Sequence, residues 1–305
     1  MTARPRLVHL VPPPNDPVDA RGDWAVVETA LGVRLPDDYK WLVEAYGWGE
    51  FGDVLYLRTP FGTNGRNGYN EHNGIEWQKA HPTDSAARDR ERYPHPLHPA
   101  PGALLVWGAT IDADRLCLLT AGAPEDWPVV VWSSEGWYET HPMGAAEFVE
   151  RWTDGRLVSR LLASMEPDLA PWFNTFRPRT HRCLRLSESR FAHPVRLRLL
   201  REALAPTVDR GRWESDAEDE WQHHLATVDH DWLLTYEAPR PHTIRVDFPP
   251  EDADLILPRL LAAVRHMGCE VLQITTAAGI PLPDPDTAMH EQPAAPAAPH
   301  VSEHR

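Results

Sequence analysis

The chain has 305 residues and carries 30 lysines and arginines against 45 aspartates and glutamates, a net charge of −15 with neutral histidines. Its length suggests two domains, and a hydrophobic content of 42 % with 25 % charged residues argues against a disordered, collagenous or coiled-coil chain. A strongly acidic chain repels phosphate backbones and anionic lipids. We therefore expect a basic protein partner, and expect the chain to bind neither nucleic acid nor a membrane.

The cysteines and the N-terminal residues indicate in which cellular compartment the protein is expected. Cys117, Cys183 and Cys269 lie far apart in the sequence, so they predict neither a disulfide framework nor a paired-cysteine metal site. No run approaches the roughly 20 apolar residues of a membrane span, and the first residues lack the apolar segment of a signal peptide. These features predict a cytoplasmic protein with reduced thiols.

Both ends of the chain look poor in packed structure. Residues 1–19 hold many prolines and are expected to form an extended arm. Residues 286–305 contain few bulky apolar side chains, so they cannot bury enough surface to offset the entropy of ordering. We expect them to form a disordered tail.

Residues 20–165 predict an α+β domain in which helices flank an antiparallel meander. Apolar residues at helical spacing indicate helices at 24–31 and 35–46 and a closing helix that starts near 145. Short apolar runs separated by turn residues indicate strands at 54–57, 104–108, 115–119, 129–132 and 136–139. The Asn- and Gly-rich segment 62–74 is interpreted as a turn-rich loop rather than a ligand cradle, because no phosphate- or calcium-binding motif accompanies it.

Residues 166–285 predict a second, smaller α+β domain, for which a ferredoxin-like arrangement is one candidate. The expected elements are strands at 183–186, 232–236, 244–248 and 270–275, and helices at 195–204 and 252–267. Residues 177–212 carry 10 arginines against 3 acids, whereas residues 213–254 carry 12 acids against 2 arginines. We favour pairing between these two stretches over nucleic-acid binding by the first.

No motif points to catalysis, a metal or a cofactor. His223, His224 and His230 lie near Asp231, but their spacing is not that of a known ligand set, so they are interpreted as polar surface on a helix or loop. Neither a serine nor a cysteine nucleophile motif is present, and Cys117 lies in an apolar run typical of a core.

Tryptophan is abundant, with 13 in the chain. Most are expected in the core, because truncating a buried tryptophan costs roughly 3–5 kcal/mol. Trp48 lies close to Glu50 and Trp127 directly follows an acidic pair, a combination typical of binding hot spots.

Several segments of the first domain resemble one family in the same order. They are Leu31-Gly32-Val33-Arg34-Leu35-Pro36-Asp37-Asp38-Tyr39-Lys40, Tyr46-Gly47-Trp48-Gly49-Glu50-Phe51, Leu104-Leu105-Val106-Trp107-Gly108, Trp127-Pro128-Val129-Val130 and Ala146-Glu147-Phe148. Residues 20–165 thereby resemble the SUKH (Smi/Knr-like) superfamily, whereas the second domain resembles no family we can name.

The resemblance implies a non-catalytic domain that binds proteins. Bacterial members are mostly immunity proteins that neutralise toxins, often nucleases, and an acidic inhibitor suits the basic surface with which a nuclease grips phosphate. We therefore expect occlusion of a basic toxin. The expected contact residues are Trp48, Glu50, Asp112, Asp114, Glu125, Asp126 and Trp127. Two alternatives stay open: a regulatory scaffold that binds a cellular enzyme, and an enzyme whose site lies in the second domain.

Overall fold

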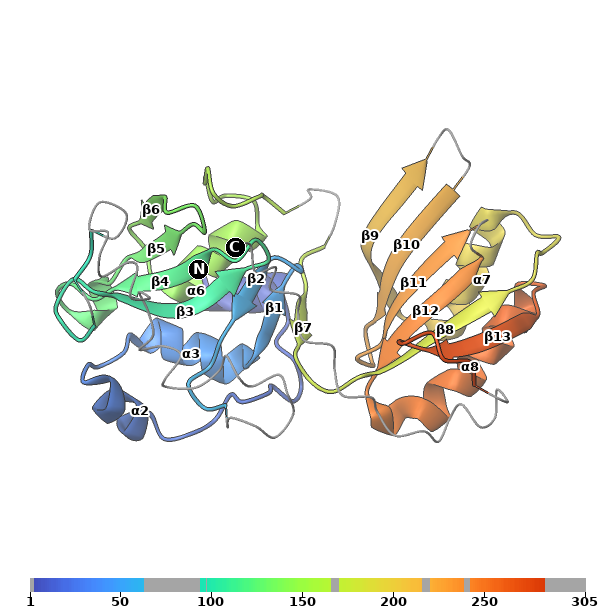
Figure 1. Ribbon diagram of the computed structural model, residues 1–305, viewed down its shortest axis with the longest axis horizontal. Coiled ribbons are helices and arrows are strands. Elements are labelled where there is room, and N and C mark those ends of the chain that lie inside the picture. The colour runs from blue at the N-terminus through green and yellow to red at the C-terminus, as the bar shows by residue number, and fades with distance from the viewer. Residues whose placement is uncertain are drawn as a thin grey trace. The chain divides into compact units, whose positions relative to one another are not determined.

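The computed structural model describes residues 3–62, 94–96, 98–165, 170–215, 220–238 and 242–282. The chain divides into two compact units, Met1–Phe176 and Arg177–Arg305, each with its own sheet and core (Figure 1). Most of the predicted loop at 62–74 and all of the predicted tail at 286–305 lie outside the described residues.

The first unit is an antiparallel sheet of seven strands with helices packed against it, which confirms the predicted α+β class (Figure 1). The strand order is β6-β5-β4-β3-β2-β1-β7. Among the described residues of this unit, the helices are α1 (Ala3–Leu10), α2 (Trp24–Leu31), α3 (Asp37–Tyr46) and α6 (Ala145–Thr153). The strands are β1 (Gly49–Phe51), β2 (Leu55–Leu57), β3 (Leu104–Thr110), β4 (Arg115–Leu119), β5 (Val129–Trp132), β6 (Tyr138–His141) and β7 (Phe173–Thr175).

The core of the first unit lies between the helices and one face of this sheet. Alternation along β3 sends Leu105 and Trp107 to the helices, while Leu104 and Val106 join a smaller apolar cluster on the other face. Aromatic side chains fill much of the main core, and among the most completely buried are Tyr39, Tyr46, Phe51, Trp107, Phe148 and Trp152. The expectation that most tryptophans support the fold therefore holds for this core.

The prediction of an extended arm over residues 1–19 is wrong for Ala3–Leu10, which forms α1. Pro5 lies in the first turn, where its missing N–H would have had no helical acceptor. The next prolines, at 12–14, follow the helix and do not interrupt it. Leu7 is completely buried, and α1 packs against α6, so tertiary contacts hold this segment in place.

Asp38 of α3 caps a helix that begins more than a hundred residues later. The residue before α6, Gly144, has no side chain to satisfy the first N–H groups of that helix, and Asp38 Oδ2 accepts a hydrogen bond from Ala146 N at 3.1 Å instead. A Cβ atom on Gly144 would lie 2.1 Å from the same oxygen. Asp38 thus joins α3 to α6, and the next residue, Tyr39, is completely buried in the core.

Replacing Asp38 by alanine is expected to lower the free energy of unfolding of the first unit by about 1–2 kcal/mol, because α6 loses its cap. Asp38→Asn should cost less, since the amide keeps an acceptor oxygen and removes a carboxylate whose pKa is raised by burial. Chemical denaturation of the full chain, followed by hydrogen exchange in α6, measures both changes. Equal stability of the alanine variant and the wild type would contradict the capping role.

The first unit extends to Phe176, beyond the boundary expected at residue 165. After α6 ends, Leu157 and Leu162 are buried without forming helix, and the chain then adds β7 beside β1. The register pairs Glu50 with Asn174 and Phe51 with Phe173. A strand of only three residues closes this edge of the sheet.

The second unit is an antiparallel sheet of six strands in the order β13-β8-β12-β11-β10-β9. Helices α7 and α8 pack against each other and share one apolar core with one face of the sheet (Figure 1). The strands are β8 (Thr180–Leu186), β9 (Thr207–Ser215), β10 (Glu220–Thr227), β11 (Leu233–Ala238), β12 (Thr243–Phe248) and β13 (Val271–Thr276), and the helices are α7 (His193–Leu204) and α8 (Ala253–His266). The hairpin of β9 and β10 was not expected from the sequence.

Candidate protein-binding surface

Three turns of the first unit meet at one end of its sheet. Residue Leu55 lies opposite Thr110, Arg115 lies opposite Trp132, and Trp132 lies opposite Tyr138. The turns at 52–54, 111–114 and 133–137 therefore lie side by side, because each joins two of these neighbouring strands.

The side chains of these turns combine exposed apolar groups with carboxylates. Ile111 is 58 % exposed and Trp137 is 65 % exposed, and the carboxylates of Asp53, Asp112 and Glu135 are exposed around them. We call these five residues the three-turn surface. Large apolar side chains surrounded by charge are typical of protein-binding sites.

Hydrogen bonds between the turns hold this surface in place. Ile111 N donates to Val54 O at 2.9 Å, which ties the second turn to the first. Asp114 Oδ1 accepts from Ser134 N at 3.0 Å, and Asp114 Oδ2 accepts from Thr110 Oγ1 at 3.2 Å. Asp114 is only 5 % exposed, so this predicted contact residue supports the turns from inside.

A negative field extends from the three-turn surface along β1. Burial, together with the carboxylates of Glu50, Asp53 and Asp112, raises the pKa of Tyr56 to about 12. Asn174 Nδ2 donates to Asp53 Oδ1 at 3.0 Å and lies 3.4 Å from Glu50 Oε1. Two of the predicted contact residues, Glu50 and Asp112, therefore belong to one acidic region.

The other predicted acidic contacts lie at the opposite end of the sheet. Glu125 and Asp126 belong to a short 3₁₀ turn between β4 and β5. Glu125 accepts hydrogen bonds from Arg34 Nη2 at 2.7 Å and from Asp37 N at 3.0 Å, whereas Asp126 is exposed. The structure thus does not gather the predicted acids into one site.

The two predicted tryptophan contacts are buried. Trp48 is 6 % exposed and packs edge-on against Phe176, and Trp127 is 4 % exposed with its Nε1 donating to Gly122 O at 3.3 Å. Both support the fold, which corrects the expectation that they contact a partner. Trp137, which the sequence placed only in a strand pair, is the exposed tryptophan of the three-turn surface.

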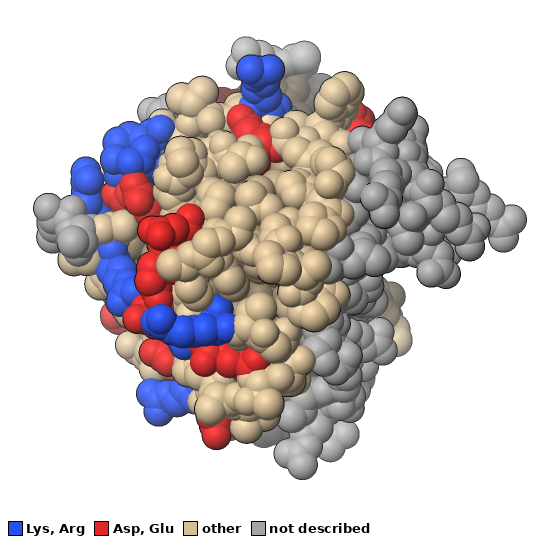
Figure 2. Space-filling view, turned by 90° about the vertical axis from the view of Figure 1, so that its left-hand side faces the viewer, with Lys and Arg blue, Asp and Glu red and all other residues tan. Residues whose placement is uncertain are grey.

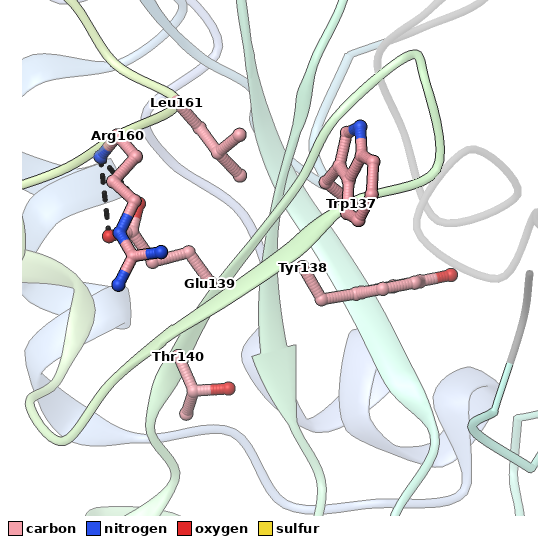
Figure 3. Close-up of a pocket in the computed structure, with 6 residues that line it drawn as sticks. All are labelled: Trp137, Tyr138, Glu139, Thr140, Arg160 and Leu161. Carbon is pink, nitrogen blue, oxygen red and sulfur yellow. Dashed lines mark hydrogen bonds between the residues drawn. The ribbon is translucent and has the colours of Figure 1, made fainter.

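A pocket of about 530 Å³ lies beside β6, next to the three-turn surface (Figure 3). Its lining residues are Trp137, Tyr138, Glu139, Thr140, Arg160 and Leu161. Glu139 accepts from Ser159 Oγ at 2.5 Å and from Arg160 N, so the segment after α6 is fastened to the edge of the sheet by one carboxylate. Trp137 thus belongs both to the lining of the pocket and to the three-turn surface.

The net charge of −15 is not spread as one acidic surface. On the face that Figure 2 shows, acidic and basic side chains lie interspersed beside a broad area without charged groups. Arg34 pairs with both Asp37 and Glu125, and Arg151 pairs with Glu147. The negative charge therefore occurs in local groups of carboxylates, such as those of the three-turn surface.

The histidines singled out in the second domain do not converge. His223 and His224 are neighbours on β10, so their side chains point to opposite faces of the sheet, and His230 stacks on Trp232 with ring centroids 4.2 Å apart. The expected helix or loop is a strand at His223 and His224, whereas His230 lies in the loop after β10, as expected. Across the described ranges, no group of three or more His, Cys, Asp or Glu residues could hold a metal ion.

His223 is half-buried and belongs to a network of otherwise buried side chains on the helix-bearing face. Its Nε2 lies 3.0 Å from Nε2 of His193, and the His193 ring stacks on Trp221 and Tyr236 at centroid distances of 4.7 and 5.3 Å. Burial, with further contributions from His223 and Arg196, lowers the pKa of His193 to about 4.

The same network continues to His242. Nε2 of His242 lies 3.2 Å from Arg196 Nη1 and 3.1 Å from the Tyr236 hydroxyl, while its Nδ1 lies 2.7 Å from Ser187 O. A guanidinium can only donate, so Nε2 accepts and Nδ1 carries the proton. We call His193, Arg196, His223, Tyr236 and His242 the imidazole network; its three histidines all have lowered pKa values, mainly because of burial.

Contacts between the Arg-rich and acid-rich stretches are present in the second unit. Arg179 Nη2 lies 2.6 Å from Asp231 Oδ1, and Arg177 also pairs with Asp231. Other ion pairs join neighbours within one stretch, such as Arg198 with Glu202 and Arg201 with Asp209.

No described helix is both long and apolar enough to cross a membrane.

A comparison with models of protein families gives a match in the first unit. The model of the family SUKH_6, described as "SMI1-KNR4 cell-wall", matches residues 21–149. The match begins shortly before α2 and ends inside α6, so it includes all three turns of the candidate surface. No curated protein matches the chain.

Proposed function

Because residues 21–149 form a domain of the SUKH superfamily, we propose that this protein is a protein-binding module of the immunity type. In this proposal it neutralises a basic toxin of the nuclease kind in the cytoplasm by covering the toxin's surface, and it catalyses no reaction itself. Members of the superfamily typically bind protein partners, which supports the general part of the proposal.

We place the binding site at the three-turn surface because of the side chains that this surface presents. Ile111 and Trp137 supply apolar anchors, and Asp53, Asp112 and Glu135 supply the negative charge that a basic partner would meet. Complementary charge mainly raises the rate of association, while a buried aromatic anchor slows dissociation. The ties between the turns favour binding further, because a rigid surface loses little entropy.

The thiol chemistry supports a non-catalytic role. Cys117 is completely buried, and burial raises the pKa of its thiol to about 12, which leaves it protonated and unreactive at neutral pH. Four of the five residues of the imidazole network are also buried, with His193 and His242 only 6 % and 5 % exposed. The network is therefore better suited to holding the second unit together than to meeting a substrate.

We also propose that the second unit is an elaborated ferredoxin-like fold. Strands β13, β8, β12 and β11 follow each other across the sheet, with α7 after β8 and α8 after β12 in the chain. This βαββαβ order with antiparallel neighbours is that of the split-βαβ motif. The hairpin of β9 and β10 then extends the sheet beyond β11.

Charge reversal at Asp112 is expected to slow association with the partner by about tenfold or more and to weaken its salt dependence. The partner is first captured from the native cell with the tagged full chain and identified by mass spectrometry, and its binding kinetics are then measured with purified proteins. We expect the Asp112→Lys variant to associate with the partner more slowly, and the Trp137→Ala variant to dissociate from it faster.

Asp126→Lys is the matched control, because it makes the same charge change on an exposed residue at the opposite end of the sheet. If Asp126→Lys weakens binding and Asp112→Lys does not, the three-turn surface is the wrong site.

Co-expression of the captured partner in a host cell distinguishes an immunity protein from a regulatory scaffold. A toxin whose effect the wild type suppresses supports immunity, whereas a harmless cellular enzyme supports the regulatory scaffold.

A further inference from the structure

Strand β9 is a long exposed edge of the second sheet. It has nine residues, pairs with β10 on one side, and has no described strand on the other (Figure 1). The opposite edge, β13, is bordered by the segment that returns past it, since Leu282 N donates to Ile274 O at 2.9 Å. Natural proteins usually cover or shorten such edges, because an open strand can pair with another chain.

The hydrogen bonds of β10 show which residues of β9 point outward. Val228 N donates to Pro206 O, and Thr227 N donates to Trp232 O, so alternate residues of β10 bond to β9 and to β11. The β10 residues that bond to β9 are Gln222, His224 and Ala226, and their partners on β9 are Trp213, Gly211 and Val208. The backbone groups of the intervening residues, Thr207, Asp209, Arg212 and Glu214, therefore point away from β10.

A bulge gives these outward residues a symmetric spacing. The register between β9 and β10 shifts by one residue at Arg210. Asp209 and Arg212 therefore occupy adjacent outward positions although their residue numbers differ by three. The spacing from Thr207 to Glu214 is thus two, three and two residues. It reads the same in both directions from the midpoint between Arg210 and Gly211.

We propose that the chain forms a two-fold symmetric dimer in which β9 pairs antiparallel with β9 of a second copy about this midpoint. Each outward residue then faces an outward residue of the partner, Asp209 opposite Arg212 and Thr207 opposite Glu214. The two sheets become one continuous sheet. The outward backbone groups form hydrogen bonds as in any antiparallel pair.

The side chains match in the same register. Opposite charges meet twice, because Asp209 and Arg212 face each other on both sides of the axis and lie on the helix-bearing face of the sheet. On the other face, Val208 meets Trp213, and these side chains are 36 % and 51 % exposed in the single chain. Such self-complementarity is what a two-fold interface requires, which favours a second copy over an unrelated strand.

Intrachain contacts leave these groups available. Asp209 pairs with Arg201 in its own chain, yet its side chain is half exposed and a carboxylate can accept from two cations. Arg212 is exposed on the strand. Gly211 carries no side chain beside the axis, and a glycine within a strand often marks the close approach of another backbone.

Sedimentation of the full chain over a concentration series tests the dimer. We expect a species of twice the 34.5 kDa chain mass for the wild type. Arg212→Asp should raise the dissociation constant of the dimer by about tenfold or more, because two attractive pairs become repulsive. The exchanged pair Asp209→Arg/Arg212→Asp should recover the dimer, and Arg265→Asp, an equal charge change on an exposed face of α8, should leave it unchanged.

Cysteine crosslinking checks the register independently. Val208 and Trp213 of two copies would form a non-hydrogen-bonded pair, whose Cα separation of about 4.5 Å suits a disulfide. Mild oxidation should therefore crosslink Val208→Cys/Trp213→Cys into a covalent dimer, and Val208→Cys alone should stay uncrosslinked like the wild type. A wild type that keeps the mass of one chain at every concentration, a dimer insensitive to Arg212→Asp, or crosslinking by the single variant would each overturn the proposal.

Discussion

Acidification from pH 7 to pH 4 is expected to reduce the free energy of unfolding of the second unit by on the order of 3 kcal/mol. The imidazole network causes this loss. Its histidines have lowered pKa values in the folded chain, so the unfolded chain binds more protons below its own histidine pKa near 6.5. Stability is therefore full above about pH 6.5 and falls as the pH approaches the value of about 4 for His193.

The geometry explains why the folded network resists protons. A second proton between His193 and His223 would place two N–H groups head to head across 3.0 Å. A proton on Nε2 of His242 would face the Arg196 guanidinium. Nearby charges include Arg201 and Arg212, which oppose protonation of His223, and Glu214 and Glu188, which favour a positive charge but do not outweigh burial.

Hydrogen exchange of β10 and β11 in the full chain, measured from pH 7 to pH 4, follows this loss. His193→Phe keeps a ring against Trp221 and Tyr236 and removes one titrating group, so the slope of stability against pH should fall by up to about 1.4 kcal/mol per unit. His266→Gln is the control, because His266 is exposed at the end of α8. A slope that His193→Phe leaves unchanged would remove the network as the cause.

Truncation of Trp152 to alanine is expected to destabilise the first unit by about 3–5 kcal/mol. The side chain is 2 % exposed, and its Nε1 donates to Ala163 O at 2.9 Å, which fastens the segment after α6 to the helix. A Cβ atom placed on Gly52 would lie 3.1 Å from the Trp152 ring, so the ring also supports the first of the three turns. Both the cavity and the lost donor contribute to the cost.

Equilibrium denaturation of the full chain measures this effect, with Trp137→Ala as the matched control. Trp137 is 65 % exposed, so its removal should change stability by less than about 0.5 kcal/mol while weakening partner binding. Trp152→Phe should lie between the two, because it keeps part of the apolar volume. A small loss for Trp152→Ala would show that the core collapses around the missing ring.

The sequence alone was sufficient to predict the position of an element where the apolar periodicity of that element was strong. The helices at α2 and α3 and the strands from β3 to β5 lie where spacing and turn residues predicted them. The segment β9 contains two arginines and a glycine, and β10 begins with polar residues and histidines, so neither shows the alternation of a strand. They are strands because they pair with each other and with β11, which no local pattern reveals.

Long-range contacts account for the other differences. Phe173–Thr175 is a strand only because β1 lies beside it, and α1 is ordered by its packing on α6. The candidate site was partly accessible from the sequence: Asp112 is one of the expected contact residues, and it is exposed in a turn of the three-turn surface. Composition could not distinguish buried Trp48 and Trp127 from exposed Trp137, because burial depends on which face of the sheet each residue joins.

The partnership of β7 with β1 determines where the first unit can be cut. The family match stops at residue 149, before the last turn of α6 and well before β7. A protein shortened to the matched region would lack β7, so the outer edge of β1 would have no strand to pair with. It would also lack α1, which exposes the face of α6 that α1 covers. Both exposed surfaces favour aggregation. The first unit should therefore be expressed with its N-terminal helix and up to Phe176, because β7 then covers the edge of β1.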